Sequence, residues 1–451
     1  MDKILMLGIA GVGMRRLAEI FVSLDFEVVG FDVKEDKNTD HLKQIGVVVN
    51  PKDFELDKSF SKIVFTSAIP KDDPILTKAQ MLNIPVQRRG EALADISKSF
   101  KSVVIAGTHG KTSTTALISE ILAKPYKVNA YIGGEHRMNE GFYRDADYFV
   151  IESDESDKTF LLFFPYAAIV TNIDRDHLNS YDWNFEHLKD SFDEFMKKSK
   201  LLFIAKDDKP AFEVSKNLSK KPFYYSLYDN TADAYATDPL FEKDGVSFGA
   251  HVLGETLPLM KLHAYGEKML SNAIGAILTS KILGVNNNEI EEAIFNFSMP
   301  KRRTEFKTNI NGIYVFDDHA DHPTEVEATL SSLRMHFPDE RIIAIFQPHR
   351  YTRIYSLQEE IAKPFYLADV VIVLPIFSAF EEPINGVTDE KVFNWIKSLN
   401  PKKDVYFVGN FDILATLVST IAKKDDIVVT LGPGNVNFAI DKIVLKLKEK
   451  A

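Results

Sequence analysis

Cysteine is absent from the 451-residue sequence, which excludes disulfide bonds, thiolate catalysis and cysteine-ligated zinc and fits a cytoplasmic enzyme. The sequence also lacks an apolar run long enough to span a bilayer, and its first residues do not begin a signal-peptide pattern. Positive charge is in the minority, with 54 Lys and Arg residues against 65 Asp and Glu residues and a net charge of −11. This balance argues against non-specific nucleic-acid binding, but not against anionic nucleotides, which need only local positive groups.

The length predicts about three domains, each able to bury its own core. Strand-like and helix-like segments alternate along much of the chain, which predicts an α/β fold. We expect a Rossmann-like domain over 1–97, a P-loop domain with a mixed or parallel sheet over 98–300, and a second Rossmann-like domain over 301–451.

The most specific pattern is a phosphate-binding loop in the middle domain. Residues 102–106 predict a strand and residues 116–122 predict a helix; between them lie Gly107, Thr108, His109, Gly110, Lys111, Thr112 and Ser113. The glycines let backbone N–H groups converge on phosphate oxygens, and the Thr112 hydroxyl suits Mg²⁺. The alternative is a glycine turn with an incidental lysine, but strand, Gly-Lys-Thr and helix coincide here, so we predict an ATP site.

Acidic residues follow two further strands of this domain. The strand-like run 148–151 leads into Glu152, Asp154, Glu155 and Asp157, and the run 168–173 leads into Asp174, Asp176 and His177. Ligands of open α/β sheets bind at the carboxyl ends of strands, and carboxylates facing a phosphate loop are what Mg²⁺ requires. The alternatives are a solvated acidic turn and a structural histidine.

The N-terminal domain opens with a glycine turn after the strand-like run 3–7. Glycines at 8, 11 and 13 are followed by Met14, and a second strand ends at Asp32, which is the layout of a dinucleotide fold. The third glycine of that fingerprint is missing, and Arg15 and Arg16 stand where small residues pack best. We therefore expect a nucleotide or sugar-nucleotide diphosphate rather than NAD; the alternative is a turn without a ligand.

In the C-terminal domain, the strand-like runs 313–316, 342–346, 370–374 and 427–431 end in polar or glycine-rich segments. Arg350 and Arg353 are three residues apart, so in a helix both guanidiniums would point the same way and would suit a carboxylate or acyl phosphate. The alternative is a solvated charged face.

Five motifs together resemble the Mur ligases, and the resemblance covers nearly the whole chain. They are residues 107–112 (GTHGKT), 152–157 (ESDESD), 176–178 (DHL), 322–325 (HPTE) and 346–353 (FQPHRYTR). Within this family the sequence is most similar to the branch that joins L-alanine to UDP-N-acetylmuramate. Residues 301–305 (KRRTE) lean slightly toward the branch that adds a recycled tripeptide to the same acceptor.

The resemblance implies a UDP-sugar-binding domain, an ATPase domain and an amino-acid-binding domain, with ATP and Mg²⁺ as cofactors and the chain acting as a monomer or weak homodimer. ATP would phosphorylate the muramoyl carboxylate, and an amino group would attack the acyl phosphate to give an amide. Carried onto this sequence, the resemblance implies that the catalytic residues are Lys111, Glu155, His177, His349, Arg350 and Arg353. It implies that Mg²⁺ is bound by Thr112, Glu155 and His177, and that ATP is bound by the seven loop residues 107–113 named above and by Asn272, Arg303, Asp318 and His319. The other substrates would be bound by Gly11, Gly13, Met14, Ser67, Asp321 and His322.

Several positions depart from the family pattern. His319 replaces a tyrosine that flanks adenine, Asp321 replaces the first of two histidines, and Lys268-Met269 replaces His-Asn before Asn272. Two alternatives from other classes stay open: a nucleotide- or UDP-sugar-binding paralogue without ligase activity, favoured by Asp321, and a dinucleotide-dependent oxidoreductase, favoured by the N-terminal glycine turn and disfavoured by Lys111 and Thr112.

Overall fold

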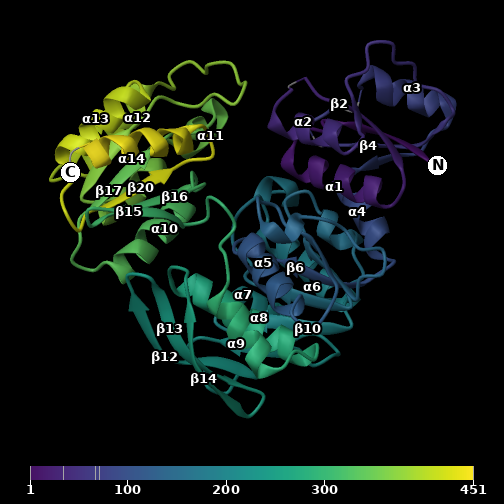
Figure 1. Ribbon diagram of the computed structural model, residues 1–451, viewed down its shortest axis with the longest axis horizontal. Helices are drawn as coiled ribbons and strands as arrows, with labels where there is room; N and C mark the ends of the chain where they lie inside the picture. The colour runs from purple at the N-terminus through teal and green to yellow at the C-terminus, as the bar shows by residue number, and fades with distance from the viewer. Residues whose placement is uncertain (1, 34, 67, 71, 450–451) are drawn as a thin grey trace. The chain divides into compact units, whose positions relative to one another are not determined.

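The computed structural model describes residues 2–33, 35–66, 68–70 and 72–449. The chain forms two compact units (Figure 1). The first holds the chain up to Pro239 with 248–261 and 268–298, and the second holds 240–247, 262–267 and the chain from Met299 onward. Each unit is an α/β structure, as the alternation of apolar runs and helical patterns predicts.

The N-terminal sheet is five-stranded and parallel, in the order β3-β2-β1-β4-β5. Its interior strands are apolar because helices cover a parallel sheet. The strands are β1 (Lys3–Leu7), β2 (Glu27–Phe31), β3 (Val48–Val49), β4 (Phe60–Phe65) and β5 (Val86–Arg88), and the helices are α1 (Val12–Ser23), α2 (Lys37–Gln44), α3 (Pro74–Leu82) and α4 (Arg89–Ser97).

The central sheet has nine strands in the order β14-β13-β12-β11-β10-β9-β6-β8-β7. Strands β7, β8, β6, β9, β10 and β11 run parallel, so the carboxyl ends of β6, β8 and β9 share one edge. The strands are β6 (Lys101–Ala106), β7 (Val128–Tyr131), β8 (Tyr148–Glu152), β9 (Ala167–Val170), β10 (Leu201–Ala205), β11 (Phe223–Ser226), β12 (Ala234–Glu242), β13 (Gly245–Val252) and β14 (Glu255–Leu262). The helices are α5 (Lys111–Leu122), α6 (Phe185–Lys198), α7 (Lys209–Ser215), α8 (Glu267–Ile282) and α9 (Asn287–Phe295).

One hydrophobic core links the N-terminal and central sheets. Residues of β1, α1 and α4 share a buried cluster with residues of β6, β8, β9 and α6. Arg16, which is 2% exposed, extends from α1 and donates hydrogen bonds to the carbonyl oxygens of Ala130 (3.1 Å) and Gly141 (2.8 Å). Arg16 stands where the sequence favoured a small residue, and in the structure it connects α1 to β7 at Ala130 and to the later residue Gly141.

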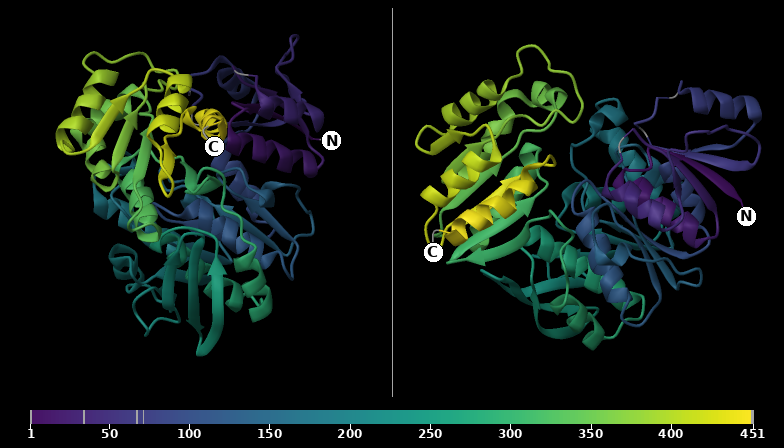
Figure 2. Two further views of the ribbon diagram at one scale, coloured as in Figure 1. Left: turned by 60° about the vertical axis from the view of Figure 1, so that its left-hand side comes forward. Right: turned by 45° about the horizontal axis from the view of Figure 1, so that its top comes forward.

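The C-terminal sheet has six strands in the order β15-β16-β20-β17-β18-β19, antiparallel only at β15–β16. The strands are β15 (Glu305–Ile310), β16 (Ile313–Asp318), β17 (Ile342–Phe346), β18 (Val370–Val373), β19 (Asp404–Phe407) and β20 (Ile427–Leu431). Helices cover both faces (Figure 2): α10 (Pro323–His336), α11 (Tyr351–Leu357) and α12 (Asp389–Leu399) contribute to the core on one face, and α13 (Phe411–Ile421) and α14 (Ala439–Glu449) to the core on the other.

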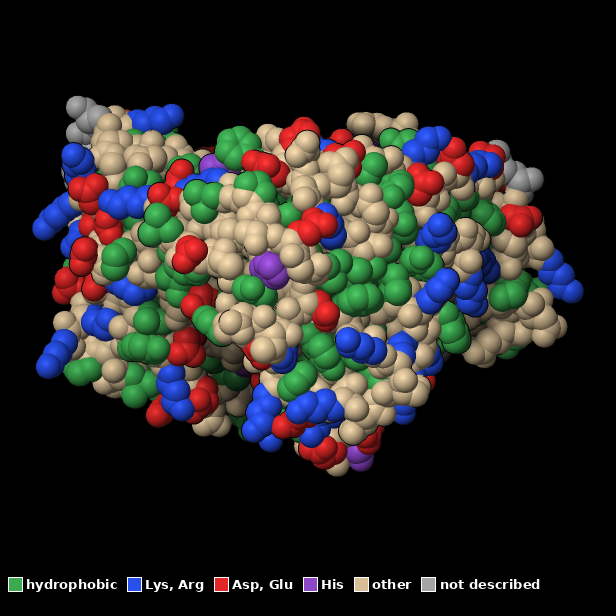
Figure 3. Space-filling model, turned by 90° about the horizontal axis from the view of Figure 1, so that it is seen from below, with side chains coloured by type: hydrophobic (Ala, Val, Ile, Leu, Met, Phe, Trp, Pro, Cys, Tyr) green, Lys and Arg blue, Asp and Glu red, His purple; other side chains and the backbone are tan. Residues whose placement is uncertain are grey.

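Charged side chains of both signs lie at the surface. On the face shown in Figure 3, acidic and basic side chains are interspersed. Over the ranges that the structure describes, none of the helices combines the length and the apolarity that crossing a membrane requires.

Candidate active site

The phosphate loop lies between β6 and α5, as predicted. Gly107 and Gly110 both have positive φ angles, of 136° and 81°. A β-carbon on Gly107 would lie 2.1 Å from Thr171 Oγ1, and one on Gly110 would lie 3.0 Å from Asn272 Nδ2. Only glycine fits both the backbone conformation and the space, which explains the spacing of the motif. Asn272, on α8, is thereby in contact with the loop.

Two residues after β9 hold this loop in place. Asn172 accepts a hydrogen bond from the backbone N–H of His109 (2.9 Å) and donates one to the His109 carbonyl oxygen (2.8 Å). The Thr171 hydroxyl donates to that same carbonyl oxygen at 2.7 Å. The sequence predicted a strand end here but gave these side chains no role; their partners lie more than sixty positions away, so no local signal identifies them.

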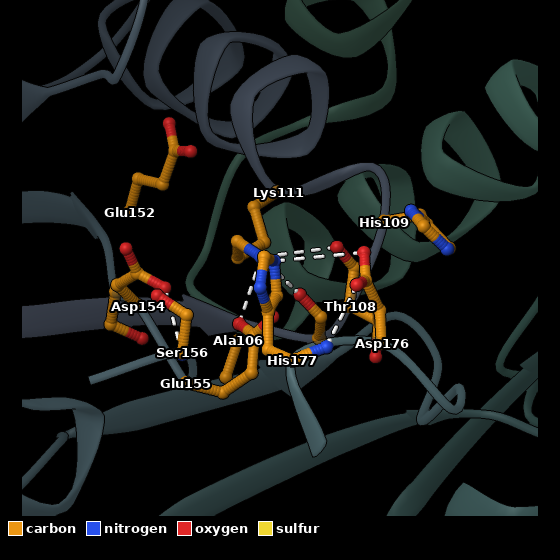
Figure 4. Close-up of polar contacts among 12 residues, drawn as sticks. Ala106, Thr108, His109, Lys111, Glu152, Asp154, Glu155, Ser156, Asp176 and His177 are labelled. Atoms are coloured by element: carbon orange, nitrogen blue, oxygen red, sulfur yellow. Dashed lines mark hydrogen bonds and ion pairs between the residues drawn. The ribbon is translucent and has the colours of Figure 1, made fainter. Parts of the chain in front are cut away.

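Lys111 lies within its own loop. Its Nζ donates hydrogen bonds to the carbonyl oxygens of Gly107 (2.7 Å) and Thr108 (3.1 Å). It also donates to Glu155 Oε2 at 2.8 Å (Figure 4), and Glu155 is 1% exposed. The other oxygen, Glu155 Oε1, is buried without a hydrogen-bond partner among the described residues. Burial raises the pKa of Glu155, while Lys111 opposes the shift.

A second carboxylate contacts the first turn of α5. The Thr112 hydroxyl donates to Glu152 Oε1 at 2.9 Å, and the backbone N–H of Gly133 donates to Glu152 Oε2 at 2.7 Å. Glu152 belongs to the acidic run that begins at the end of β8, and the sequence indicated no metal or catalytic role at this position. Glu152 and Glu155 therefore differ, since only Glu155 has an oxygen without a partner.

His109, Asp174 and His177 complete this region. His109 Nε2 lies 3.4 Å from Asp174 Oδ2, and this contact is the main reason why the pKa of Asp174 falls to about 2. The His177 side chain is 43% exposed and lies 3.6 Å from Asp176 Oδ2. Figure 4 shows the phosphate loop, the acidic segment after β8 and the Asp176-His177 pair gathered in one region.

The side chains around the phosphate loop offer oxygen donors to a divalent cation. Across the described parts of the chain, no three His, Asp or Glu side chains are arranged as a ready-made metal site. A cation that also takes phosphate and water oxygens needs fewer protein ligands, and Mg²⁺ binds nucleotides in that way. The unpartnered Glu155 Oε1 and the Thr112 hydroxyl are hard oxygen donors, so the residues fit Mg²⁺ brought by a nucleotide.

Asp32 and Asn38 hold the N-terminal glycine turn through hydrogen bonds to its backbone. Asp32 Oδ2 accepts from the Ala10 backbone N–H (2.8 Å), and Asn38 Nδ2 donates to the Ala10 carbonyl oxygen (2.9 Å). Asp32 thus stabilises the turn, which fits the absence of a full dinucleotide fingerprint. A β-carbon on Gly13 would lie 2.3 Å from Arg89 Nη1, so the turn packs closely against that guanidinium.

Three other predicted substrate residues of this domain differ in their environment. Gly11 precedes the first residue of α1 as its N-cap. Met14 is 2% exposed and belongs to the core, so the prediction for it reduces to its backbone. Ser67 lies outside the described residues.

In the second unit, the buried Asp321 is the centre of a cluster with His349 and Arg353, both of which are partly exposed. Asp321 is 4% exposed and its Oδ1 accepts a hydrogen bond from Arg353 Nη1. Its Oδ2 lies 3.4 Å from His349 Nδ1, and neither atom has a hydrogen-bond partner among the described residues. Arg350 is exposed and has a φ of 62°, so α11 begins only at Tyr351 and the two arginines do not share a helix.

The comparisons with known proteins cover the entire chain. Three family models match: "Mur ligase family, catalytic domain" over 3–101, "Mur ligase middle domain" over 105–280, and "Mur ligase, glutamate ligase domain" over 302–434. A UDP-N-acetylmuramate–L-alanine ligase of Dictyoglomus turgidum is 36% identical over 445 residues, covering 96% of this chain and 94% of the relative. One of Geotalea daltonii is 35% identical over 462 residues, covering 99% and 98%.

The chain belongs to the Mur ligase family. The resemblance drawn from the five motifs is confirmed, as is the three-domain α/β fold class. The crystal structure of the UDP-N-acetylmuramate–alanine ligase MurC from Thermotoga maritima has the same fold, with a TM-score of 0.82 at 23% identity over 100% of both chains. A murein peptide ligase from Psychrobacter arcticus matches with a TM-score of 0.67 at 23% identity, covering 99% of each chain.

His319 and the Lys268-Met269 pair depart from the Mur ligase pattern, and they differ in exposure and charge environment. His319 is exposed at the surface, yet partial burial and the neighbouring Arg303 and Arg302 lower its pKa to about 4, so the ring is neutral at pH 7. A neutral imidazole retains a flat face for stacking. Lys268 precedes Met269, which is buried, on the first turn of α8.

Asp318 and the Lys301-Arg302-Arg303 run form a compact junction of this Mur ligase. Asp318 Oδ2 accepts hydrogen bonds from the Thr304 backbone N–H (2.6 Å) and hydroxyl (2.8 Å), and burial raises the pKa of Asp318. Arg302, rather than Arg303, binds Asp317 Oδ2 at 3.0 Å. Arg303 acts on Asp318 through its charge, which opposes the effect of burial.

His322 lies at the N-terminus of α10. Its Nδ1 accepts from the Thr324 backbone N–H at 3.4 Å, and Glu325 Oε2 accepts from the His322 backbone N–H, also at 3.4 Å. These contacts cap the helix, so His322 has a structural task beside the substrate role predicted for it.

Proposed function

We propose that this protein is an ATP-dependent ligase that joins L-alanine to UDP-N-acetylmuramate in peptidoglycan precursor synthesis. The observation that carries the proposal is full-length similarity, at 36% and 35% identity, to two relatives that bear the name of this activity. The phosphate loop with Lys111, Thr112 and Glu155 supports the ATP-dependent half of the reaction.

The first half-reaction transfers the γ-phosphate of ATP to the muramoyl carboxylate. Lys111 is bound to its own loop and to Glu155, so it must exchange these partners for phosphate oxygens when ATP arrives. The loop N–H groups and the first turn of α5, including Ser113, would bind the phosphates. Asn272, Arg303, Asp318 and a stacking His319 would hold the rest of the nucleotide.

Mg²⁺ would be held by Thr112 and Glu155, with His177 near a second ion. Bound there, Mg²⁺ would neutralise phosphate charge and polarise the transferred phosphoryl group. The buried Glu155 Oε1, which has no partner among the described residues, supports this assignment because an uncompensated carboxylate oxygen is costly.

The second half-reaction joins the amino group to the activated carboxyl. The N-terminal turn at Gly11, Gly13 and Met14 would bind the UDP part of the acceptor. His349, Arg350 and Arg353 would gather the substrates. The two guanidiniums suit the anionic acyl phosphate and the carboxylate of L-alanine.

Phosphate release tests the proposal. ATP, Mg²⁺ and UDP-N-acetylmuramate are incubated with the protein while single amino acids and the tripeptide L-Ala-γ-D-Glu-diaminopimelate are offered in turn. We expect release that depends on L-alanine and product whose mass is that of the acceptor plus one alanine residue. Release only with the tripeptide would make the tripeptide, rather than L-alanine, the substrate that is joined to UDP-N-acetylmuramate. Tight nucleotide binding without release would identify a paralogue that lacks ligation.

Neither alternative activity has an observation in its favour beyond the sequence features already named. The tripeptide branch is represented by a structural neighbour with a TM-score of 0.67, below the 0.82 of the alanine ligase. The oxidoreductase hypothesis depended on the glycine turn, whose Asp32 is occupied by the Ala10 backbone N–H.

A further inference from the structure

The buried Asp321 stands where the family pattern places a histidine, and it faces the partly buried His349. We propose that Asp321 is a positioning residue that holds the proton of His349 on Nδ1 and leaves His349 Nε2 to accept a proton from the amino group of the incoming L-alanine. This inference rests on the proposed function, because it names the base for the second half-reaction.

The geometry of two facing orphan atoms carries the inference. Asp321 Oδ2 and His349 Nδ1 are 3.4 Å apart, both are buried, and neither has another partner among the described residues. A buried polar atom without a partner is costly, and a hydrogen bond between these two atoms would remove the cost for both. A carboxylate only accepts, so the pairing requires the proton to be on Nδ1 of the neutral ring.

Neighbouring groups hold both partners of the pair. Arg353 donates a hydrogen bond to the other oxygen of Asp321, which orients that carboxylate. The His349 ring stacks on Phe377, with centroids 5.8 Å apart and planes 14° apart. Backbone hydrogen bonds from Arg350 N–H to Phe377 O (2.9 Å) and from Phe377 N–H to Pro348 O (2.8 Å) fix the chain on both sides of His349.

The cluster also explains how an aspartate is tolerated at this position. An unpaired buried carboxylate would be strongly destabilising, but Arg353 supplies the opposite charge directly. His349 then uses the oxygen that Arg353 leaves. This is the arrangement by which a carboxylate orients a histidine base in hydrolytic triads.

The proton transfers balance as follows. The ammonium group of L-alanine gives one proton to His349 Nε2, and the resulting amine attacks the carbonyl carbon of the acyl phosphate. The C–N bond forms, the tetrahedral intermediate collapses, and the C–O bond to phosphate breaks. The second proton of the nitrogen leaves with the phosphate, and the imidazolium returns its proton to water after product release. Asp321 takes no proton in these steps and holds the ring through Nδ1–H.

The tautomer of His349 tests the inference without any substrate. Full-length protein labelled with ¹⁵N-histidine is examined by NMR at alkaline pH, and His349→Gln identifies the signal among the 11 histidines. We expect the Nδ1–H tautomer in the wild type and a shift toward Nε2–H in Asp321→Asn. An Nε2–H tautomer in the wild type would overturn the inference, and this result needs no variant at Asp321 to fold.

Kinetics supply the second test. Asp321→Asn should lower kcat with L-alanine by about 10²-fold, the low end of what a positioned base contributes, with little change in the KM for L-alanine. The double variant with His349→Gln should be no slower than His349→Gln alone, because both changes remove one device. The matched control Asp412→Asn, an exposed carboxylate paired with Lys442, should leave kcat unchanged.

A different outcome would assign Asp321 to charge neutralisation alone. If Asp321 only neutralised Arg353, Asp321→Asn would release the guanidinium, lower the KM for L-alanine and leave kcat intact, and the two substitutions would be additive. Either result would overturn the inference. Lack of turnover with L-alanine in the wild type would instead contradict the proposed function, and the tautomer measurement would still decide the role of Asp321 toward His349.

Discussion

Glu155 in the first unit and Asp321 in the second are buried carboxylates with the same local arrangement. Each accepts a hydrogen bond from one cation, Lys111 or Arg353, and each has a second oxygen without a hydrogen-bond partner among the described residues. The difference is what lies opposite that second oxygen. Glu155 belongs to the acidic segment beside a phosphate loop, whereas Asp321 Oδ2 faces an imidazole nitrogen.

This difference separates two kinds of chemistry that the reaction needs. Beside a phosphate loop, an uncompensated carboxylate oxygen suits a hard cation that arrives with ATP. Beside an imidazole, the same oxygen fixes a tautomer and prepares a base. We therefore expect one kind of ion pair to support phosphoryl transfer in the first unit, through Lys111 and Glu155, and proton transfer in the second, through Arg353 and Asp321.

The largest effect is expected at the cation of the first unit. Lys111→Ala removes the charge that neutralises the phosphates, and we expect L-alanine-dependent phosphate release to fall by at least about 10³-fold, because electrostatic stabilisation dominates phosphoryl transfer. Binding of UDP-N-acetylmuramate, measured by calorimetry, should be unchanged. Lys124→Ala, which removes a surface ion pair with Glu292 from the same helix region, is the control; equal losses in both variants would contradict the assignment.

The two glutamates near Thr112 should differ in how they affect the Mg²⁺ requirement. We expect Glu155→Gln to raise the Mg²⁺ concentration for half-maximal activity by about 100-fold and Glu152→Gln by about 10-fold, since Glu152 acts through the Thr112 hydroxyl. The measurement is phosphate release against Mg²⁺ concentration at saturating ATP. A larger effect from Glu152→Gln would reverse the roles assigned to the two carboxylates.

Asn172 should have a smaller effect, specific to ATP. Asn172→Ala removes two hydrogen bonds to the His109 backbone, and at about 1 kcal/mol for each bond the KM for ATP should rise roughly 30-fold. The KM for L-alanine should not change. The exposed Asn217→Ala serves as the control, and an unchanged KM for ATP in Asn172→Ala would show that Thr171 alone holds the loop.

The smallest effect concerns pH and His319. The folded pKa of about 4 lies below the ordinary 6.5, so between these values the unfolded chain binds a proton that the folded chain does not. The stability that His319 contributes is therefore complete above about pH 6.5 and decreases as the pH falls toward 4. Relative to that of His319→Gln, the urea midpoint of the wild type should therefore fall as the pH is lowered from 6.5 toward 4. Because the residue is exposed, the change is small, and a difference between the two midpoints that does not vary with pH would refute it.

The phosphate loop could be predicted from the sequence because its signal is local. Strand, glycines, Lys111 and helix lie within about twenty residues, and positive φ angles at Gly107 and Gly110 leave glycine as the fitting residue. The apolar runs likewise located most strands, since the strands of a covered parallel sheet are buried on both faces.

The partners of these residues could not be predicted in the same way. Asn172 contacts His109 across sixty-three positions, and Asp321 contacts Arg353 across thirty-two, so only the folded chain brings them together. The expectation that Arg350 and Arg353 share a helix was conditional on a helix over both, and α11 starts after Arg350. In the sequence, Asp321 favoured a paralogue without ligase activity. Its pairing with Arg353 follows only from the fold.

The most direct test of the ligase account follows an oxygen atom. UDP-N-acetylmuramate labelled with ¹⁸O in its muramoyl carboxylate is converted in the presence of ATP, Mg²⁺ and L-alanine, and the released phosphate is analysed by mass spectrometry. The account predicts one ¹⁸O atom in each phosphate, because the carboxylate oxygen leaves with the phosphoryl group. Phosphate without the label would mean that water attacks ATP. The acyl-phosphate intermediate, and the roles assigned to Glu155 and Asp321 in its formation and use, would then be contradicted.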